Sequence, residues 1–267
     1  KAGSGGGGGG GTLAARASLK GHTHTVEDVV FKPGSSEQLA SVGDDHALLL
    51  WDTRTGTSPV SSVKDAHGRG HDVQCVDWEP HGESLLATGA DDGSLRIWDV
   101  RKVGAPAAAA AAGCVHTFAG VHTGGIIRLE WHPRSPGVFA SGGEDKLINV
   151  WQLGAAGGGG GGDSGAPPEL LFRHAGHRHG KVVDFQWSPD EDLPWTMVSV
   201  SDHVSDGEQD GGGSLQLWRV NDLIYRPEDE VVAEINAHTA FVVNGEPPAV
   251  DGRAGGSTQA AAAAGGK

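Results

Sequence analysis

Short runs of alternating apolar and polar residues recur along the chain, and four of them end in an aromatic residue, one further residue and a proline. These runs are residues 26–33, 73–80, 126–133 and 182–189. Alternation with a period of two predicts half-buried β-strands, and the Asp/Gly-rich pairs between later runs predict tight hairpin turns. We therefore expect an all-β chain, in which a helical pattern is discernible only over residues 221–235.

A tryptophan near the end of each repeat is preceded by the same residue types at fixed distances. In the first three repeats an Asp stands six residues before the Trp and a Ser or Thr stands ten before it, with a His further upstream. The four sets are His22, Ser41, Asp45 and Trp51; His67, Thr88, Asp92 and Trp98; His122, Ser141, Asp145 and Trp151; and His177, Ser199 and Trp218. We expect each set to form a structural network in which the indole N–H donates to the hydroxyl, the hydroxyl bonds the His, and the Asp orients the His.

His, Ser and Asp also make up the catalytic triad of hydrolases, so this alternative has to be weighed. An enzyme needs one activated nucleophile in a cleft and does not repeat it in every structural unit. The clustered histidines His174, His177 and His179 lack nearby cysteines or a helical spacing, which disfavours a metal site. The glycine runs do not end in the Gly-Lys-Ser/Thr of phosphate-binding loops. We predict no catalytic residues, no metal and no cofactor.

Four registered copies of this pattern resemble the WD40-repeat family over residues 13–238. The resemblance implies a β-propeller whose blades are four-stranded antiparallel sheets. We assign blades to about residues 13–66, 67–121, 122–176 and 177–238, linkers to 104–113 and 154–166, and disorder to 1–12 and 239–267. A seven-bladed ring needs roughly 280–315 residues. We therefore expect an incomplete ring of about four blades, the C-terminal portion of a longer propeller.

Composition narrows the class of partner. The chain has 267 residues, of which 45 are glycine, and much of this glycine lies in runs of the kind found in flexible linkers. The formal net charge of −14 disfavours direct nucleic-acid binding and suits a basic protein partner, although acidity also serves solubility alone. Two cysteines fit a reducing compartment, and no apolar run is long enough to span a membrane.

A narrower resemblance rests on particular segments. Residues 24–31 with 41–57, and residues 167–189 with 194–202, look like the retinoblastoma-binding, MSI-like histone-binding proteins, and residues 211–235 resemble the plant FVE (MSI-like) branch. The resemblance implies a non-catalytic, nuclear scaffold that binds core histones. Such a scaffold serves deacetylase, Polycomb-type methyltransferase or chromatin-assembly complexes and contributes to transcriptional repression.

The resemblance also implies two histone-binding surfaces. A histone helix would occupy a groove at the segment comprising Asp163, Pro167, Pro168, Glu169, Leu170, Leu171 and Phe172, with the acids facing basic side chains. The alternative is that residues 169–172 are only an outer strand of their blade. A histone tail would lie on a second face at Glu27, Gln74 and Asp202. Gly125 and Ile127 depart from the family there, since relatives carry an acidic and an aromatic residue at these positions.

A second functional class remains open because two repeats end in Trp-Asp-x-Arg. Trp51, Asp52 and Arg54, and likewise Trp98, Asp99 and Arg101, resemble the boxes by which substrate receptors bind the adaptor of cullin-type ubiquitin ligases. Trp-Asp is also the ordinary ending of a WD40 repeat. The boxes therefore indicate either a ligase substrate receptor or simply the end of a blade.

Overall fold

The computed structural model describes residues 15–82, 84–104, 113–154, 167–205, 210–211, 213–220 and 232–233. All strands lie in a first compact unit, residues 1–224, and only residues 232–233 of the second unit are described, as helix. The expected disordered ends, most of the linkers at 104–113 and 154–166, Asp163 and the rest of the 221–235 segment lie outside the described residues.

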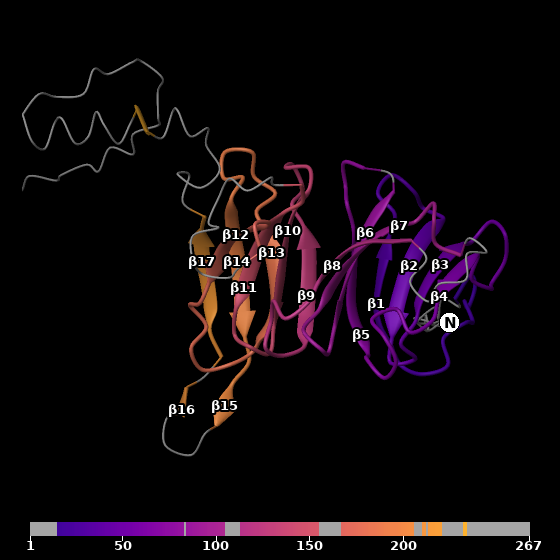
Figure 1. The fold of residues 1–267 in the computed structure, drawn as a ribbon, viewed down its shortest axis with the longest axis horizontal. Coiled ribbons are helices and arrows are strands. Elements are labelled where there is room, and N and C mark those ends of the chain that lie inside the picture. Colours follow the sequence, from indigo (N-terminus) through magenta and orange to yellow (C-terminus); the bar gives the residue numbers. More distant parts are fainter. Residues whose placement is uncertain are drawn as a thin grey trace, which may run out of the picture. The chain divides into compact units, whose positions relative to one another are not determined.

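The strands form three four-stranded antiparallel sheets and a fourth sheet of three strands (Figure 1). The first sheet contains β1 (Val26–Phe31), β2 (Gln38–Gly43), β3 (Leu48–Asp52) and β4 (Ser61–Val63). The second contains β5 (Val73–Trp78), β6 (Leu85–Ala90), β7 (Leu95–Asp99) and β8 (Cys114–Phe118). The third contains β9 (Ile126–Trp131), β10 (Val138–Gly143), β11 (Ile148–Gln152) and β12 (Leu170–His174). The fourth contains β13 (Val182–Trp187), β14 (Thr196–Ser201) and β17 (Leu215–Arg219), with a separate hairpin of β15 (Val204–Ser205) and β16 (Asp210–Gly211).

Each sheet is a meander whose strands pair in chain order, which is how short strands joined by tight turns assemble. The turn between the second and third strands places one residue in the left-handed region: His46 at φ 61°, Gly93 at φ 74° and Lys146 at φ 69°. Only Gly93 adopts this conformation without steric cost. In the first and third turns the preceding aspartates accept main-chain N–H hydrogen bonds, Asp45 from Thr23 before β1 and Asp145 from Leu147 within the turn.

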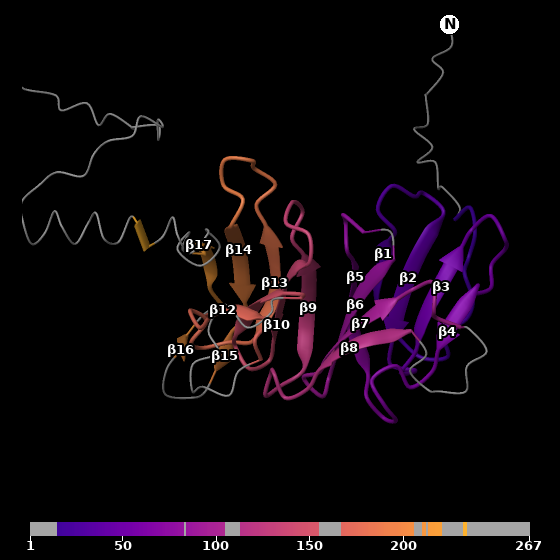
Figure 2. The same cartoon turned by 45° about the horizontal axis from the view of Figure 1, so that its top comes forward.

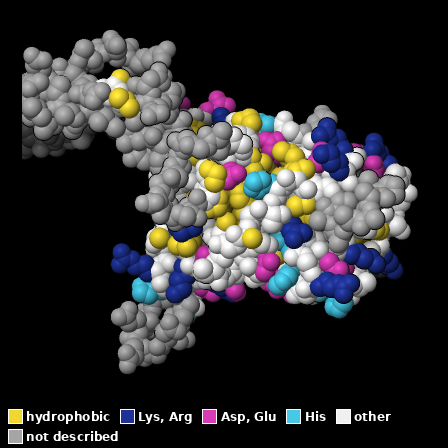
Figure 3. Space-filling view, viewed as in Figure 1, with side chains coloured by type: hydrophobic (Ala, Val, Ile, Leu, Met, Phe, Trp, Pro, Cys, Tyr) yellow, Lys and Arg dark blue, Asp and Glu magenta, His cyan; other side chains and the backbone are white. Residues whose placement is uncertain are grey.

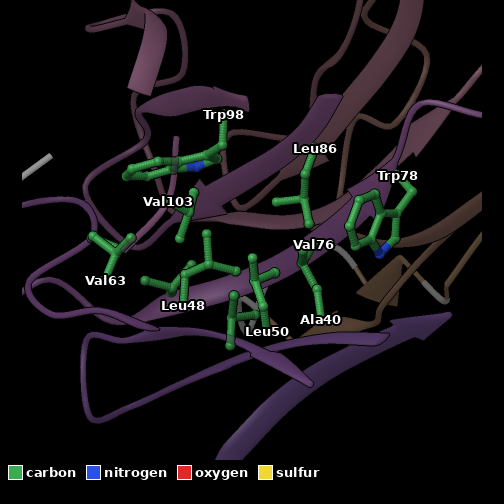
Figure 4. Close-up of a cluster of buried hydrophobic side chains, with 12 residues drawn as sticks. Ala40, Leu48, Leu50, Val63, Val76, Trp78, Leu86, Trp98 and Val103 are labelled. Carbon is green, nitrogen blue, oxygen red and sulfur yellow. The ribbon is translucent and has the colours of Figure 1, made fainter. Parts of the chain in front are cut away.

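Neighbouring sheets pack face to face through apolar side chains. Leu48 and Leu50 of β3 lie in one buried cluster with Val76, Trp78 and Trp98 of the second sheet (Figure 4). A second cluster joins the second sheet to the third. The second blade thus buries one face against the first blade and the other against the third, which a single sheet cannot do alone. The described blades form an open row that is not closed into a ring (Figure 2). The all-β WD40 architecture predicted from the repeats is confirmed.

Carboxylates on the innermost strands link consecutive blades. Asp28 accepts a hydrogen bond from the main-chain N–H of Val76 at 2.9 Å, and Asp77 accepts one from Trp131 at 2.8 Å. Glu130 lies 3.3 Å from the N–H of Trp187. Burial raises the pKa of Asp77 to about 6 and that of Glu130 to about 7. The carboxyl groups at these blade interfaces therefore keep their protons to a higher pH than exposed carboxyl groups do.

This burial predicts a pH dependence for Glu130→Gln. Because the folded state raises the pKa of Glu130, the fold loses stability as pH rises from the unfolded pKa through about 7. The uncharged Gln variant escapes this loss, so its free energy of unfolding relative to the unmodified chain should increase by about 3 kcal/mol between pH 4 and pH 8. Urea unfolding across this range measures the difference, and a constant difference would contradict the raised pKa.

No helix in the described part of the chain is long and apolar enough to cross a membrane.

Candidate functional site

The first and third blades each bring one predicted set of four residues together. His122 lies 2.9 Å from Asp145 Oδ2 through Nδ1 and 2.8 Å from Ser141 Oγ through Nε2. Trp151 donates its indole N–H to Ser141 Oγ at 2.9 Å. In the first blade His22, Ser41, Asp45 and Trp51 make the same contacts at 2.7–2.8 Å. With Nδ1–H donating to the carboxylate, Nε2 of each His accepts from the hydroxyl.

The second and fourth blades complete the network with a serine in place of the aspartate. His67 Nδ1 lies 2.8 Å from Ser94 Oγ, while Asp92 accepts the main-chain N–H of Ser94 at 2.9 Å. Asp92 therefore contacts Ser94, which bonds His67, although the sequence predicted a direct contact between Asp92 and His67. In the fourth blade Ser214 lies 3.0 Å from Nδ1 of His177. Neither Ser94 nor Ser214 was among the predicted residues.

The remaining contacts of these two networks follow the prediction. Nε2 of His67 lies 2.7 Å from Thr88 Oγ1, which accepts the indole N–H of Trp98 at 2.8 Å. Nε2 of His177 lies 2.7 Å from Ser199 Oγ, which accepts from Trp218 at 3.0 Å. All four hydroxyls are at most 4% exposed, and each already accepts an indole N–H. A hydroxyl so enclosed cannot reach a substrate, so the geometry suits a structural network.

The rings of His174 and His177 lie 5.8 Å apart, but the two histidines have different hydrogen-bond partners. His174 stacks on Trp218 with ring centroids 4.2 Å apart and bonds Gln216. Burial lowers the pKa of His177, which keeps that ring neutral. Among the described residues, no group of three or more His, Cys, Asp or Glu side chains is placed to hold a metal ion.

An acidic rim, defined here as Glu27, Asp44 and Asp72, lies where β1 begins and the neighbouring loops end. Partial burial and the nearby carboxylate of Asp44 raise the pKa of Glu27, and Asp72 adds to the effect. Asp72 lies 3.0 Å from Nδ1 of His46. Like charges held this close favour the binding of a cation, because a cation relieves their repulsion.

The other predicted tail-face residues lie on the following blades. Gln74 is half-buried on β5, and a side chain at Gly125 would come within 3.3 Å of its amide oxygen. Asp202 is half-buried just after β14 and leaves Oδ1 buried without a hydrogen-bond partner. Glu27 was predicted from the sequence, whereas Asp44 and Asp72 were not. Their only sequence signal was the doubled Asp of the first hairpin turn and the His-Asp pair before β5.

The predicted groove segment leads into the outer strand of the third blade. Pro167, Pro168 and Glu169 form the turn before β12, and Leu170, Leu171 and Phe172 are its first three residues. Leu170 packs on the core cluster of the blade, and the Phe172 ring lies 5.9 Å from that of Trp218.

Charge and apolar surface meet around this segment. Glu169 lies 3.8 Å from Nε2 of His116 on β8. The space-filling view shows apolar side chains gathered in the region of β8 and β12 (Figure 3). The surface at β12 therefore offers half-buried apolar side chains beside a carboxylate, and the strand itself belongs to the blade. Asp163, the other expected acid, lies outside the described residues.

Both arginines of the Trp-Asp-x-Arg endings bind the aspartate of their own box. Arg54 donates to Asp52 from Nε at 2.9 Å and from Nη2 at 2.6 Å, and Arg101 donates to Asp99 at 2.9 Å from both atoms. The arginine side chains are 65% and 73% exposed. The hydrogen bonds from Arg54 lower the pKa of Asp52 to about 2. These pairs close the turn after the third strand and leave the outer side of each guanidinium open to solvent.

Comparison with known proteins agrees with this architecture. The WD40 family model (WD domain, G-beta repeat) matches residues 14–52, 57–99 and 112–152. The WD-40 repeat-containing protein MSI4 of Arabidopsis thaliana is 44% identical over 235 residues, covering 87% of this chain and 44% of that protein. Histone acetyltransferase type B subunit 2 of Debaryomyces hansenii is 33% identical over 209 residues, covering 78% of this chain and 46% of that protein.

The chain spans less than half the length of these two curated relatives. WD40 proteins of this type are non-catalytic subunits, in keeping with hydroxyls that are buried in every blade. Its blades, their repeated His–hydroxyl–Trp networks and its sequence identities lead to one assignment: the chain is a WD40-repeat protein related to MSI4 and to histone acetyltransferase type B subunit 2.

Proposed function

We propose that the chain is a non-catalytic, histone-binding scaffold subunit of nuclear chromatin complexes. The complexes are of the deacetylase, Polycomb-type methyltransferase or chromatin-assembly kind, and the chain contributes to transcriptional repression there. The observation that carries the proposal is the acidic rim at Glu27, Asp44 and Asp72, on a chain related to a subunit of a histone acetyltransferase.

The rim suits an extended basic segment. Each carboxylate can accept a charge-assisted hydrogen bond from an arginine or lysine, and burial together with the neighbouring carboxylates of Asp44 and Asp72 raises the pKa of Glu27. The net charge of −14 adds a long-range attraction that speeds the capture of a basic partner. Core histones supply such segments in their tails. The surface at β12 is the proposed site for a histone helix, with Glu169 and Leu171 as contacts.

Removing charge from the rim tests the tail site. Glu27→Gln combined with Asp44→Asn should weaken binding of a labelled core-histone tail peptide by about 3- to 10-fold, because each exposed ion pair contributes up to about 1 kcal/mol. Fluorescence anisotropy at two salt concentrations measures the affinity, and the loss should shrink at high salt.

The matched control for the rim variant is Glu191→Gln. Glu191 lies on a loop after β13, is 84% exposed and pairs with Arg134. The substitution therefore removes a carboxylate charge outside the rim. Its affinity should stay within twofold of the unmodified chain, as expected for a screened exposed charge. The rim variant removes two charges and the control removes one, so a free-energy loss from the control of half that from the rim variant, or more, would reduce the effect to net charge and would contradict a tail site at the rim.

A second candidate function is that of a substrate receptor for a cullin-type ubiquitin ligase. The observation that favours it is the exposure of Arg54 and Arg101 at equivalent positions of neighbouring blades. Arg54→Ala with Arg101→Ala should abolish co-purification with the ligase adaptor and leave histone-peptide affinity unchanged. The side chains of Asp52 and Asp99 are only 10% and 5% exposed, so urea unfolding of the variant is measured alongside to separate a loss of folding from a loss of adaptor binding. Adaptor binding that survives both substitutions would reduce the boxes to blade endings.

A further inference from the structure

A hollow of about 290 Å³ lies between the first and second blades, at the strand ends opposite the acidic rim. The rim lies where β1 and β5 begin, whereas the hollow lies where these two strands end and where β2 begins. Leu50 and Trp78 connect the hollow to the buried cluster of Figure 4. The first blade contributes Lys32, Gln38 and Val60 to its wall, and the second contributes Trp78, Val100 and Arg101. Both walls belong to blades that pack on each other within the chain.

The interface between the second and third blades fills the equivalent space with apolar side chains. Leu85 is the first residue of its strand, as Gln38 is of β2, and Leu153 follows its repeat tryptophan by two positions, as Val100 does. Both leucines pack on the core cluster that joins these two blades. An amide and a shorter side chain stand at these positions in the first interface. The hollow therefore exists because Gln38 and Val100 replace the leucines that close the next interface.

The tryptophans that end the inner strands show the same difference in packing. Trp131 donates its indole N–H to the main-chain oxygen of Asp77 at 3.1 Å, and Trp187 donates to that of Glu130 at 3.2 Å. The indole nitrogen of Trp78 is buried and has no hydrogen-bond partner in the described part of the chain. Buried N–H groups are nearly always paired, so an unpaired one indicates incomplete packing. The first interface is therefore packed less completely around its tryptophan than the two that follow.

The charges around the hollow are opposite in sign to that of the chain as a whole. The formal net charge is −14, yet the described residues that line the hollow include two cations, Lys32 and Arg101, and no carboxylate. Lys32 is half-buried and forms no ion pair with any described residue. Arg101 bonds Asp99, but its side chain is 73% exposed, which leaves the outer side of the guanidinium open. A pair of carboxylates placed here would gain charge-assisted contacts with both cations.

We propose that the hollow is a docking site for an extended acidic segment of a partner protein, in which one apolar side chain is flanked by Asp or Glu. The apolar side chain enters the hollow and packs on Trp78, Val60 and Val100, while the flanking carboxylates bond Lys32 and Arg101. A volume of about 290 Å³ is at the lower limit of ligand pockets, which suits one anchoring side chain better than a whole ligand. This site goes beyond histone binding and does not depend on it, because the rim lies at the other strand ends.

Selection from a displayed library of random dodecapeptides on the unmodified chain tests the proposal. The filled variant, Gln38→Leu with Val100→Leu, serves to subtract every peptide that binds elsewhere, including basic peptides that bind the rim. The remaining peptides should combine an apolar residue with flanking Asp or Glu residues. A remaining pool that lacks this combination, or a pool that the filled variant removes completely, would overturn the proposal.

The filled variant carries the leucines of the next blade pair, so it should fold and unfold at a similar urea concentration. Gln38 also bonds Asp52, but that carboxylate keeps its two bonds from Arg54. The affinity of the variant for a selected peptide should fall at least about tenfold, because the anchor loses its pocket. Its affinity for a core-histone tail peptide should stay unchanged. Loss of tail binding by the rim variant and of acidic-peptide binding by the filled variant are therefore separate results.

Lys32→Gln tests the charge without changing the packing of the blades. Fluorescence anisotropy with a labelled selected peptide should show about a 3- to 10-fold loss of affinity that shrinks at high salt. The matched control is Lys102→Gln, which removes a cation that is 64% exposed, pairs with Asp99 and does not line the hollow. Its affinity should stay within about twofold of the unmodified chain. Losses of the same size in both variants would contradict docking at the hollow. Arg54 and Arg101 are unchanged throughout, so adaptor binding is tested separately.

Competition distinguishes a protein segment from a small carboxylate as the occupant. Acetyl-leucine carries one apolar side chain and one carboxylate, but it lacks the flanking acids and the extended backbone. It should leave a selected peptide bound at millimolar concentration. Complete displacement would mean that the hollow takes small carboxylates, and would overturn the assignment to a partner protein.

Discussion

Replacement of Trp151 by alanine is expected to lower the free energy of unfolding by about 3–5 kcal/mol. Trp151 is fully buried and packs against Phe118 and Phe139, with ring centroids 5.0 and 6.1 Å away. Its indole N–H also donates to Ser141 Oγ. Alanine would leave a large cavity between the second and third blades and remove the donor, and both effects oppose folding.

The matched control is Trp218→Ala, which changes the equivalent residue of the fourth blade. Trp218 donates to Ser199 in the same way, but it is half-buried and its blade has no successor among the described residues. We expect it to cost about 1–2 kcal/mol, since less surface returns to water. Urea unfolding followed by tryptophan fluorescence measures both variants. Equal losses in the free energy of unfolding would show that a tryptophan between two blades stabilises the fold no more than one in the last described blade.

Asp145→Ala is expected to cost about 2–3 kcal/mol, because it leaves a buried ring nitrogen without its partner. The side chains of His122 and Asp145 are 0% and 3% exposed, and Nδ1 of His122 lies 2.9 Å from the carboxylate. Asp92→Ala is the matched control, because Asp92 occupies the same turn and bonds Ser94 in place of the His. We expect the control to cost less than about 1 kcal/mol, as for a lost turn contact.

The Asp145 contribution should also depend on pH. Burial by itself raises the pKa of Asp145, but the hydrogen bond and charge of His122 outweigh it and lower the pKa. A carboxylate whose pKa is lowered by folding stabilises the protein above its unfolded pKa of about 4, and this stabilisation is lost as pH falls through the folded value. The difference between the unmodified chain and Asp145→Ala should therefore be largest above pH 5 and shrink below pH 4. A difference that grows on acidification would contradict the network.

Much of the fold could be predicted from the sequence because each blade repeats the same chemistry. The aromatic-x-Pro endings marked the inner strands, and the spacing from each Trp marked the network residues. Prediction reached its limit where a blade departs from the repeat. Asp92 has the expected spacing, yet Ser94 bonds His67 in its place. Only the side-chain positions show which of the two residues contacts the His.

The candidate site was less predictable, since it depends on which loops meet. Glu27 came from the resemblance. Asp44, 17 positions away in the chain, joins it when β1 pairs with β2, and Asp72, 45 positions away, joins it only when the first two blades pack. The carboxylates of Asp77 and Glu130 were missed for the same reason. Both carboxylates alternate with apolar residues, a pattern typical of the solvent-facing side of a strand. In the structure the next blade covers them.

Titration of the unmodified chain with an intact core histone at physiological salt tests the histone-binding proposal most directly. We predict saturable binding that weakens steeply as salt rises, and a much weaker interaction with a basic polypeptide of the same composition in scrambled order. Binding that does not saturate, or equal binding of the histone and the scrambled polypeptide, would contradict a histone-binding scaffold and leave only a general attraction between opposite charges.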